Sequence, residues 1–378
     1  MGKIHFADLF CGTGGFSKGF TNYSDSFELV FAVDLLQIAA KTTIKNHKDT
    51  FVVNDDIRKS KPLEIKNHLR ISKQRKLDLI IGGPPCQGFS SIRPFRSSDD
   101  EDPRNSLFEE FARYINCFRP KMFVLENVVG ITTHAKGSFL AQMQELFLNL
   151  GYITDWRILN TANFGIPQKR ERFIMIGAEK GGKICFPKPT HQFDGKTIGS
   201  KRKNKMIMLQ NENAPHALTV MDAISDLPEI ESGDTAEHYY DSKTEYQRKR
   251  RKNEDKLTMH ESTRHSDKML EIIRHSGSSI SSIPSHLITS GFSTCYSRLE
   301  ANEPANTITV NFVHPASNKC IHPTQNRALT PREGARLQGF DDDFIFCGNR
   351  AQIVKQIGNA VPPLIGQAIA SSIFDYIG

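Results

Sequence analysis

The sequence predicts an α/β protein built on a doubly wound, mostly parallel sheet, with a smaller and irregular second domain. Short apolar runs alternate with helical patterns through the first half of the 378-residue chain, as in a parallel sheet covered by helices. A glycine-rich turn follows the first apolar run, at the sheet edge where such folds bind ligands. From residue 186 to 300 the chain is polar and lacks regular apolar spacing. We therefore expect a sheet domain made of residues 1–185 and 350–378, with a second domain, 186–349, inserted between them.

Apolar spacing predicts the individual elements of the sheet domain. Five apolar runs are predicted to be parallel strands, at residues 4–10, 27–33, 50–53, 77–81 and 121–125. Helices are predicted after the first two strands and at residues 106–118 and 139–150. The helix after the second strand is expected to carry Ala39, Ala40 and Ile44. Residues 152–159 and 172–177 are expected to close the sheet as a hairpin-like pair.

Two helices are predicted near the end of the chain. Thr330, Pro331 and Glu333 form a helix start, with Thr330 as N-cap, proline in the first turn and glutamate completing a capping box. The apolar stretch 364–377 is predicted to be a terminal helix that returns to the first domain and packs on its sheet.

Composition limits the classes of protein that fit. The formal net charge is +7, which permits a nucleic-acid partner without requiring one. The seven cysteines are scattered without Cys-x-x-Cys spacing, so we expect no metal site and a reduced, cytoplasmic protein. The N-terminus runs directly into a strand, which argues against a signal peptide. No apolar run reaches the ~18 residues of a membrane span, so no membrane association is expected.

Two segments of the second domain are basic. Residues 200–205 are one, and residues 243–256 hold seven lysines and arginines against three acids. Such a run is typical of a solvated loop, and it is also typical of a surface that contacts phosphates. Both interpretations stay open from the sequence.

The glycine-rich turn predicts a nucleotide-type cofactor. It reads Asp8-Leu9-Phe10-Cys11-Gly12-Thr13-Gly14-Gly15, and an acid, Asp34, ends the second strand. Asp34 is placed to bind a ribose diol, Asp56 an adenine amino group, and Phe10 to stack on the adenine. The GxGxxG pattern that opens a helix toward a pyrophosphate is absent. S-adenosylmethionine, which has no phosphate, therefore fits better than a dinucleotide, which remains the alternative.

A second loop carries a candidate nucleophile. Gly82-Gly83-Pro84-Pro85 follows the fourth strand and holds Cys86 on a stiff turn. A thiolate is a strong nucleophile, although a cysteine in a turn can also be purely structural. A carboxylate and two guanidinium groups are predicted to converge with it at the ends of other strands: Glu126, Arg170 and Arg172.

These groups suit the methylation of a cytosine ring. Cytosine C5 is too weak a nucleophile to take a methyl group from a sulfonium unaided, but addition of a thiolate at C6 makes C5 enamine-like. Glu126 would neutralise charge at N3 of the base, and an arginine at O2 would stabilise it electrostatically. A base in a duplex must be extruded before a thiol in a pocket can reach it.

The sequence resembles the bacterial-type cytosine-C5 DNA methyltransferases. Six blocks that resemble those of this family occur in the family's order: 8–16, 84–90, 126–128, 168–172, 327–340 and 356–362. The resemblance implies a Rossmann-like methyltransferase domain and a target recognition domain within residues 186–349, including a connecting helix from Thr330 to Gly339. It also implies double-stranded DNA as substrate, S-adenosylmethionine as methyl donor, a monomer, and a possible partner endonuclease of a restriction-modification system.

The resemblance assigns roles residue by residue. Cys86 corresponds to the nucleophile, Glu126 to the contact with the flipped base, and Arg172, supported by Arg170, to the contact with O2. The residues that would line the cofactor site are Phe10, Gly12, Gly14, Asp34, Asp56, Ile57, Pro85, Leu107 and Asn359. Gln87 and Ser90 are expected near the DNA backbone or the flipped nucleotide.

Two positions depart from the family pattern, and three other functions compete. Asp34 stands where the family usually has glutamate, and Leu35 follows where many members have an aromatic residue, so cofactor affinity is expected to be modestly weaker. A tRNA methyltransferase on the same scaffold is disfavoured because the insert is long and basic and a Cys-Phe-Thr block is absent. A catalytically silent DNA-binding regulator would lack one of the reacting residues. A nicotinamide oxidoreductase would carry GxGxxG.

Overall fold

The computed structural model describes residues 2–71, 76–85, 107–194, 213–252, 254–288 and 291–377. Its centre is a seven-stranded sheet with the order β3-β2-β1-β4-β5-β8-β6. The strand bounds are β1 Ile4–Leu9, β2 Phe27–Asp34, β3 Phe51–Asn54, β4 Leu79–Gly82, β5 Met122–Asn127, β6 Tyr152–Asn160 and β8 Glu171–Glu179. The first five strands pair in parallel, and β8 is antiparallel to both β5 and β6. The predicted fold class and closing hairpin are therefore confirmed.

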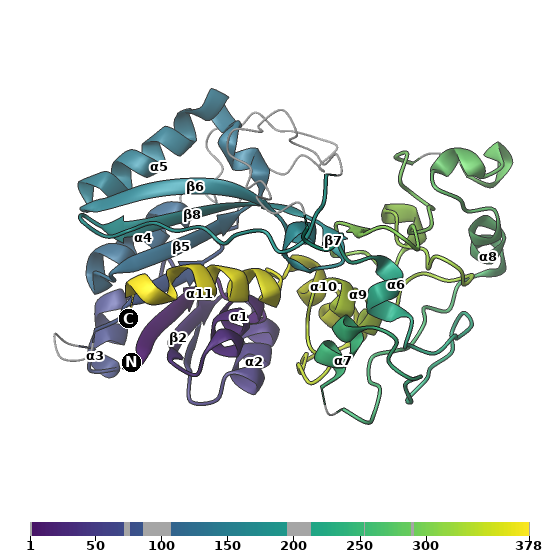
Figure 1. The fold of residues 1–378 in the computed structure, drawn as a ribbon, viewed down its shortest axis with the longest axis horizontal. Coiled ribbons are helices and arrows are strands. Elements are labelled where there is room, and N and C mark those ends of the chain that lie inside the picture. Colours follow the sequence, from purple (N-terminus) through teal and green to yellow (C-terminus); the bar gives the residue numbers. More distant parts are fainter. Residues whose placement is uncertain are drawn as a thin grey trace.

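Helices cover both faces of this sheet (Figure 1). They are α1 Gly15–Tyr23, α2 Gln37–Asn46, α3 Pro62–His68, α4 Leu107–Phe118, α5 Ser138–Asn149 and α11 Pro363–Ile377. Neighbouring strand residues alternate between two cores, because side chains of a strand point to opposite faces. Ile80 packs with α3, α4 and α5, whereas Ile81 packs with α1 and α11. Such a sheet is doubly wound, as predicted.

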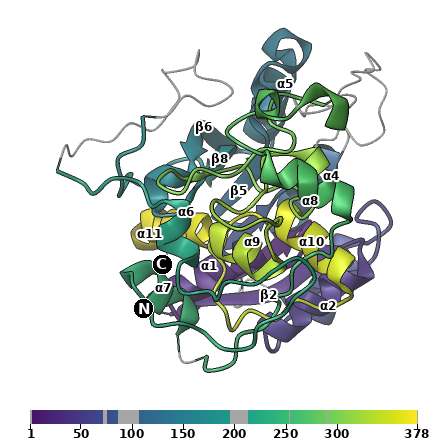
Figure 2. The ribbon, with the colours of Figure 1, turned by 90° about the vertical axis from the view of Figure 1, so that its right-hand side faces the viewer.

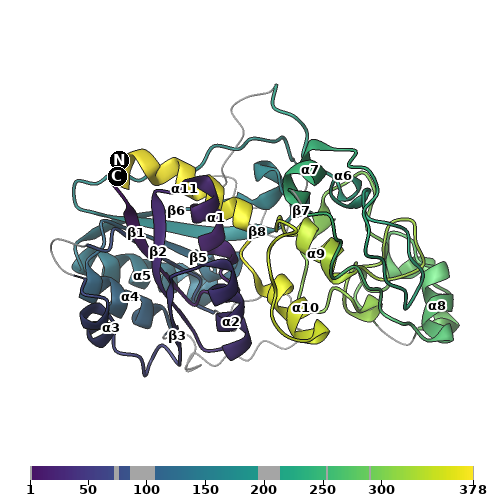
Figure 3. The ribbon, with the colours of Figure 1, turned by 90° about the horizontal axis from the view of Figure 1, so that it is seen from below.

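The terminal helix α11 returns to the first domain, as predicted. Ile365, Ile369 and Ile373 are fully buried against the face of the sheet that α1 also covers. The views in Figures 1 and 3 both show α11 alongside α1, with the two chain ends close together. By length and composition, Arg350–Ile377 is the one stretch of the described chain apolar enough to cross a membrane. It spans α10 (Arg350–Asn359) and α11, and 56% of the apolar 18-residue window within it is buried inside the protein.

The second domain is built from short helices around its own core, with α9 at the centre (Figure 2). Its elements are α6 Val220–Ile224, α7 Glu245–Arg251, α8 Asp267–Arg274, β9 Ala305–Asn306 and α9 Pro331–Leu337. Thr330 and Glu333 form the predicted capping box of α9. The sequence did not predict α6, α7 or α8, because they span only five to eight residues, too few for an apolar pattern to repeat over several turns.

Three arginines on or beside α9 are almost completely buried. Arg327 binds the carboxylate of Glu333 through both terminal nitrogens, at 2.9 and 2.7 Å. Arg332 and Arg336 share the carboxylate of Asp342, at 3.0 Å from Arg332 and 2.6 Å from Arg336. Because buried charges must be paired, these contacts fix how the loops of the domain pack around α9.

The apolar residues of α2 differ in burial, since Ala39 and Ala40 are buried whereas Ile44 is 52% exposed. The inward face of α2 is partly polar, because Thr42 hydrogen-bonds Gln356 and Thr43 donates to the carbonyl of Gly12. The helix α10 was not predicted; its apolar side chains pack in the core of the second domain, although the expected boundary at residue 350 assigns it to the first.

Candidate active site

The glycine-rich turn adopts a conformation that only a few residue types tolerate. Phe10, Gly12 and Gly14 have φ angles of 60°, 53° and 73°. A Cβ on Gly14 would lie 3.0 Å from the His47 ring, so this position needs glycine for both its backbone angle and its space. The turn therefore runs close over α2 and leads directly into α1.

Asp34 is held at the same sheet edge by two backbone groups. One carboxylate oxygen accepts from the Gly12 N–H and the other from the Leu36 N–H, both at 2.8 Å. Burial raises the pKa of Asp34, and these two hydrogen bonds oppose the shift. Beside it, Leu35 and Leu36 are 64% and 58% exposed, which is unusual for leucine and leaves apolar surface uncovered next to the carboxylate.

The other predicted cofactor residues lie in varied surroundings. Arg58 donates to both carboxylate oxygens of Asp56 at 2.9 and 3.1 Å, and these hydrogen bonds lower the pKa of Asp56 to about 2. Ile57 is 5% exposed and belongs to the sheet core. Leu107 starts α4 and is also buried, whereas Pro85 and Asn359 are exposed.

Glu126 and Arg172, two of the side chains predicted to converge, lie in contact. Glu126 lies on β5 and Arg172 on the neighbouring strand β8, and Arg172 Nε is 2.8 Å from Glu126 Oε1. Their side chains are only 11% and 14% exposed. Burial lowers the pKa of Arg172, and the carboxylate of Glu126 opposes that shift. The pair is therefore a largely desolvated carboxylate–guanidinium contact.

The loop after β4 lies directly against this pair. A Cβ on Gly83 would lie 3.0 Å from Glu126 Oε2, so glycine allows the loop to approach the carboxylate. Asn127 Nδ2 donates to the carbonyl of Pro84 at 3.1 Å and holds the loop at the end of β5. The predicted nucleophile Cys86, with Gln87 and Ser90, lies outside the described residues. This described segment ends at Pro85, one residue before Cys86, and its Gly83 lies against Glu126.

Arg170 binds backbone carbonyl groups, whereas Arg172 binds the carboxylate of Glu126. Its guanidinium is buried and donates to the carbonyls of Ile308 at 3.0 Å and of Gly358 and Ala360 at 3.3 Å. Burial, with Arg172 nearby, lowers the pKa of Arg170. Arg170 thus joins the sheet domain to the second domain and to the end of α10, beside the Glu126–Arg172 pair.

Sequence reasoning missed a buried polar group beneath the glycine-rich turn. Burial raises the pKa of Asp8 to about 8, and its Oδ2 has no hydrogen-bond partner among the described residues. Ser17 donates to the carbonyl of Gly14 at 3.1 Å, and the His47 ring nitrogen lies 2.9 Å from the same oxygen. Burial lowers the pKa of His47 to about 4. Only the polar identity of residue 8 within an apolar strand signalled this group in the sequence.

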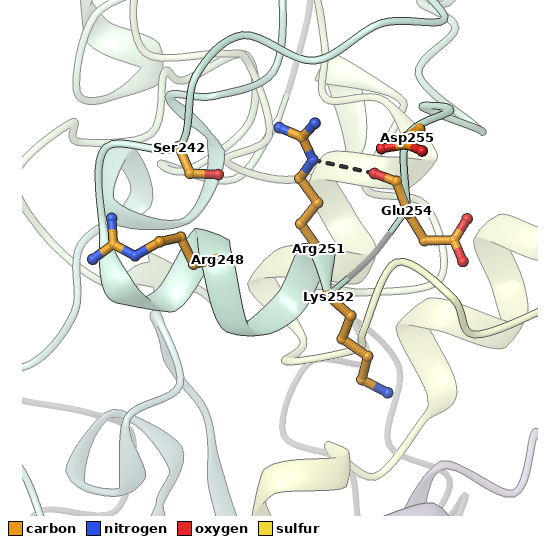
Figure 4. A pocket seen from close by; sticks show the side chains of 6 residues that line it. All are labelled: Ser242, Arg248, Arg251, Lys252, Glu254 and Asp255. Carbon is orange, nitrogen blue, oxygen red and sulfur yellow. Dashed lines mark hydrogen bonds between the residues drawn. The ribbon is translucent and has the colours of Figure 1, made fainter.

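The second basic segment forms the helix α7 and is largely paired within the protein. Arg250 Nη1 lies 2.6 Å from Asp341, and Lys252 Nζ lies 2.8 Å from Asp341. Figure 4 shows the C-terminal part of α7, where Arg251 donates to the Glu254 backbone carbonyl. The guanidinium of Arg251 also lies 4.3 Å from the centre of the Tyr239 ring. These contacts favour a structural role for residues 250–252 over the phosphate contact considered from the sequence. Residues 200–205 lie outside the described residues.

Comparisons with known proteins give matches over nearly the whole chain. The family profile described as C-5 cytosine-specific DNA methylase matches residues 4–375. The type II methyltransferase M1.HphI of Haemophilus parahaemolyticus is 36% identical over 98% of this chain and 87% of its own length. The type II methyltransferase M.AgeI of Thalassovita gelatinovora is 31% identical over 97% of this chain and 98% of its own.

Solved structures agree at the level of the fold. A crystal structure described as a putative prophage-encoded DNA modification methyltransferase, from E. coli, has a TM-score of 0.75 at 24% identity over 99% of both chains. Spodoptera frugiperda DNMT2 has a TM-score of 0.60 at 16% identity over 99% of both chains. At these identities the likeness extends to the fold alone.

Proposed function

This chain belongs to the C-5 cytosine-specific DNA methylase family, which uses S-adenosylmethionine as methyl donor, and we propose that Cys86, Glu126 and Arg172 carry out its methyl transfer to cytosine in DNA. The observation that supports these roles most directly is the buried Glu126–Arg172 contact, 2.8 Å long, beside the loop that leads to Cys86. A carboxylate and a guanidinium beside that loop are the groups that an extruded base would need near a thiol.

The reaction divides among these residues as follows. The thiolate of Cys86 forms a bond to C6 of the cytosine, and Glu126 holds a proton at N3 so that the ring can accept the electron pair. Arg172 binds O2, where negative charge develops, and this stabilisation of the transition state is worth about 3 kcal/mol in a desolvated site. S-adenosylmethionine supplies the methyl group that C5 then takes. Loss of the C5 proton to a base expels the thiolate and restores the aromatic ring.

The described residues fit S-adenosylmethionine at the edge formed by β1 and β2. Asp34 faces the glycine-rich turn, with each oxygen already accepting one N–H and keeping a lone pair for a ribose hydroxyl. Leu35 and Leu36 offer uncovered apolar surface for the adenine, in place of the aromatic residue common in the family. Asp56 would reach the adenine amino group while it stays bound to Arg58.

Finer aspects of the biology follow from the relatives. Since relatives that match nearly the whole chain are named type II methyltransferases, we infer that this enzyme is the modification half of a restriction-modification system, with a cognate endonuclease. We expect a monomer that acts in the cytoplasm on double-stranded DNA. Its second domain would serve as the target recognition domain. The matching family is named for DNA, which disfavours the competing tRNA substrate.

Three variants test the roles. Cys86→Ala is expected to abolish transfer of labelled methyl groups to duplex DNA, and Glu126→Gln and Arg172→Lys to lower kcat by roughly 100-fold or more. Duplex DNA carrying 5-fluorocytosine should form a stable covalent complex with the wild-type enzyme, because fluorine at C5 cannot leave as a proton does. Transfer of label to tRNA instead of DNA would refute the substrate. Residual C5 methylation by Cys86→Ala would refute the covalent route, and bisulfite sequencing of a plasmid from expressing cells would report the recognition site.

A further inference from the structure

The two domains are joined by a short strand that precedes the site. The strand β7 (Gln168–Lys169) pairs in parallel with β9 of the second domain, in the register Gln168 with Ala305 and Lys169 with Asn306. The Ala305 N–H also donates to the carbonyl of Pro167 at 2.9 Å. A two-residue ladder is a weak attachment by itself, so side chains must define its geometry.

The side-chain amide of Gln168 fixes the geometry of this attachment. Its Nε2 donates to the carbonyl of Leu337 at 3.2 Å and to Gln338 Oε1 at 2.8 Å, while its Oε1 accepts from the Ile308 N–H at 2.8 Å. Gln338 in turn donates from Nε2 to the carbonyl of Ile357 at 2.6 Å. Both glutamine side chains are completely buried, at 0% exposure. One pair of amides therefore connects β7, the end of α9, the segment after β9 and α10.

This junction is continuous with the base-binding pair proposed above. Only three residues separate Gln168 from Arg172, and Arg170 between them donates to the carbonyl of Ile308, the same residue whose N–H binds Gln168. Arg172 then contacts Glu126 at 2.8 Å. A shift of the junction therefore moves the strand that carries Arg172 relative to the second domain.

We propose that Gln168 and Gln338 are positioning residues that set the second domain against the Glu126–Arg172 pair, and thereby seat the extruded cytosine for attack. The proposal rests on the role proposed for that pair. Neither glutamine touches the reacting atoms; each acts through the strand and helix it joins. A small displacement is sufficient, because a misplacement of about 1 Å can cost about 100-fold in rate.

The test uses a change that keeps size and removes donors. Gln168→Glu retains an acceptor for the Ile308 N–H but cannot donate to Leu337 and Gln338 when ionised. Gln338→Glu likewise loses its donation to Ile357. The matched control is Gln247→Glu, because Gln247 is also 0% exposed and also donates and accepts, but only within the second domain, to Ser225 Oγ and from the Lys243 and Thr244 N–H groups.

The readouts separate positioning from simple destabilisation. For each full-length variant we would measure the melting temperature, the affinities for S-adenosylmethionine and for duplex DNA, and the single-turnover rates of methyl transfer and of adduct formation on 5-fluorocytosine DNA. In the Gln168 and Gln338 variants we expect the rates with saturating DNA to fall about 10- to 100-fold while cofactor affinity stays within about twofold. In Gln247→Glu the rate per folded molecule should stay at the wild-type value.

Each outcome decides the proposal. Wild-type rates in both junction variants would overturn it, as would an equal loss of rate in Gln247→Glu at the same loss of melting temperature. If Gln168→Glu does not fold, Gln338→Glu carries the test alone. Full activity of Glu126→Gln would refute the proposed role of the Glu126–Arg172 pair, whereas the junction variants are compared with a wild-type site, so the two failures are distinguishable.

Discussion

Replacing Asp342 by asparagine tests whether the buried ion network holds the second domain together. Asp342 accepts hydrogen bonds from Arg332, from Arg336 through two nitrogens, and from the Tyr239 hydroxyl, at distances between 2.6 and 3.0 Å. Asparagine keeps the shape but removes the charge and turns an NH2 group toward these donors. Breaking a buried pair while its partner stays charged costs about 3–5 kcal/mol. Because Asp226 still lies 3.2 Å from Arg336, we expect the lower end of this range, about 3 kcal/mol.

The single tryptophan of the chain makes the assay specific for a domain. Trp156 lies on β6 and packs against Phe173 of the sheet, so its fluorescence reports unfolding of the first domain. Calorimetry reports the whole protein. In Asp342→Asn we expect a calorimetric transition that precedes the Trp156 transition, because the second domain melts first.

A charge-matched control is available on α7. Glu245 forms an exposed pair with Lys249, so Glu245→Gln should leave both transitions unchanged. If Asp342→Asn unfolds at the wild-type temperature by both probes, the buried ion network does not hold the second domain and the reasoning is refuted.

Three further predictions concern the cofactor edge and the basic helix. Asp34→Asn should weaken binding of S-adenosylmethionine by roughly tenfold in equilibrium dialysis, because one acceptor for the ribose and the Gly12 N–H is lost, and unchanged affinity would contradict the ribose contact. Because burial raises the pKa of Asp8 from its ordinary value of 3.8 to about 8 in the folded protein, the free energy of unfolding should fall as pH rises between these values. Asp8→Asn should reduce this pH dependence, which can reach about 1.4 kcal/mol per pH unit, when the free energy of unfolding is measured by urea titration at several pH values. An unchanged pH dependence would contradict a raised pKa of Asp8 in the folded protein. Arg250→Gln should lower the melting temperature through its lost pair with Asp341 and leave the salt dependence of DNA binding unchanged; a smaller salt slope would instead indicate a phosphate contact.

The sheet domain could be predicted from the sequence because local signals and the fold agree there. The apolar runs of β1, β2 and β5 are long enough to be recognised, and distinctive glycine and proline patterns follow β1 and β4. Parallel strands bring their carboxyl ends to one edge, so residues as far apart in sequence as Phe10, Asp34 and Glu126 could be placed there without coordinates.

The second domain could not be predicted in the same way. Its order comes from long-range pairs, such as Arg336 with Asp226 and Arg250 with Asp341, that leave no periodic pattern in the sequence. The interpretation of the basic run was open for the same reason, since a cation is paired or solvated according to distant partners. The position of Arg170 also depends on carbonyl groups more than a hundred residues away, and the roles assigned to Cys86 and its cofactor contacts stay predictions.

The return of α11 to the sheet affects how the chain folds as it is synthesised. Ile365 and Ile369 pack in one core with Phe6 of β1 and Phe20 of α1, which come from the opposite end of the sequence. On a ribosome, this apolar face stays without its helix until the whole intervening second domain has emerged. Contacts over such a separation close slowly and leave apolar surface exposed meanwhile. Nascent chains that stop before α11 should therefore be bound by chaperones or aggregate, even though they already contain every strand of the sheet.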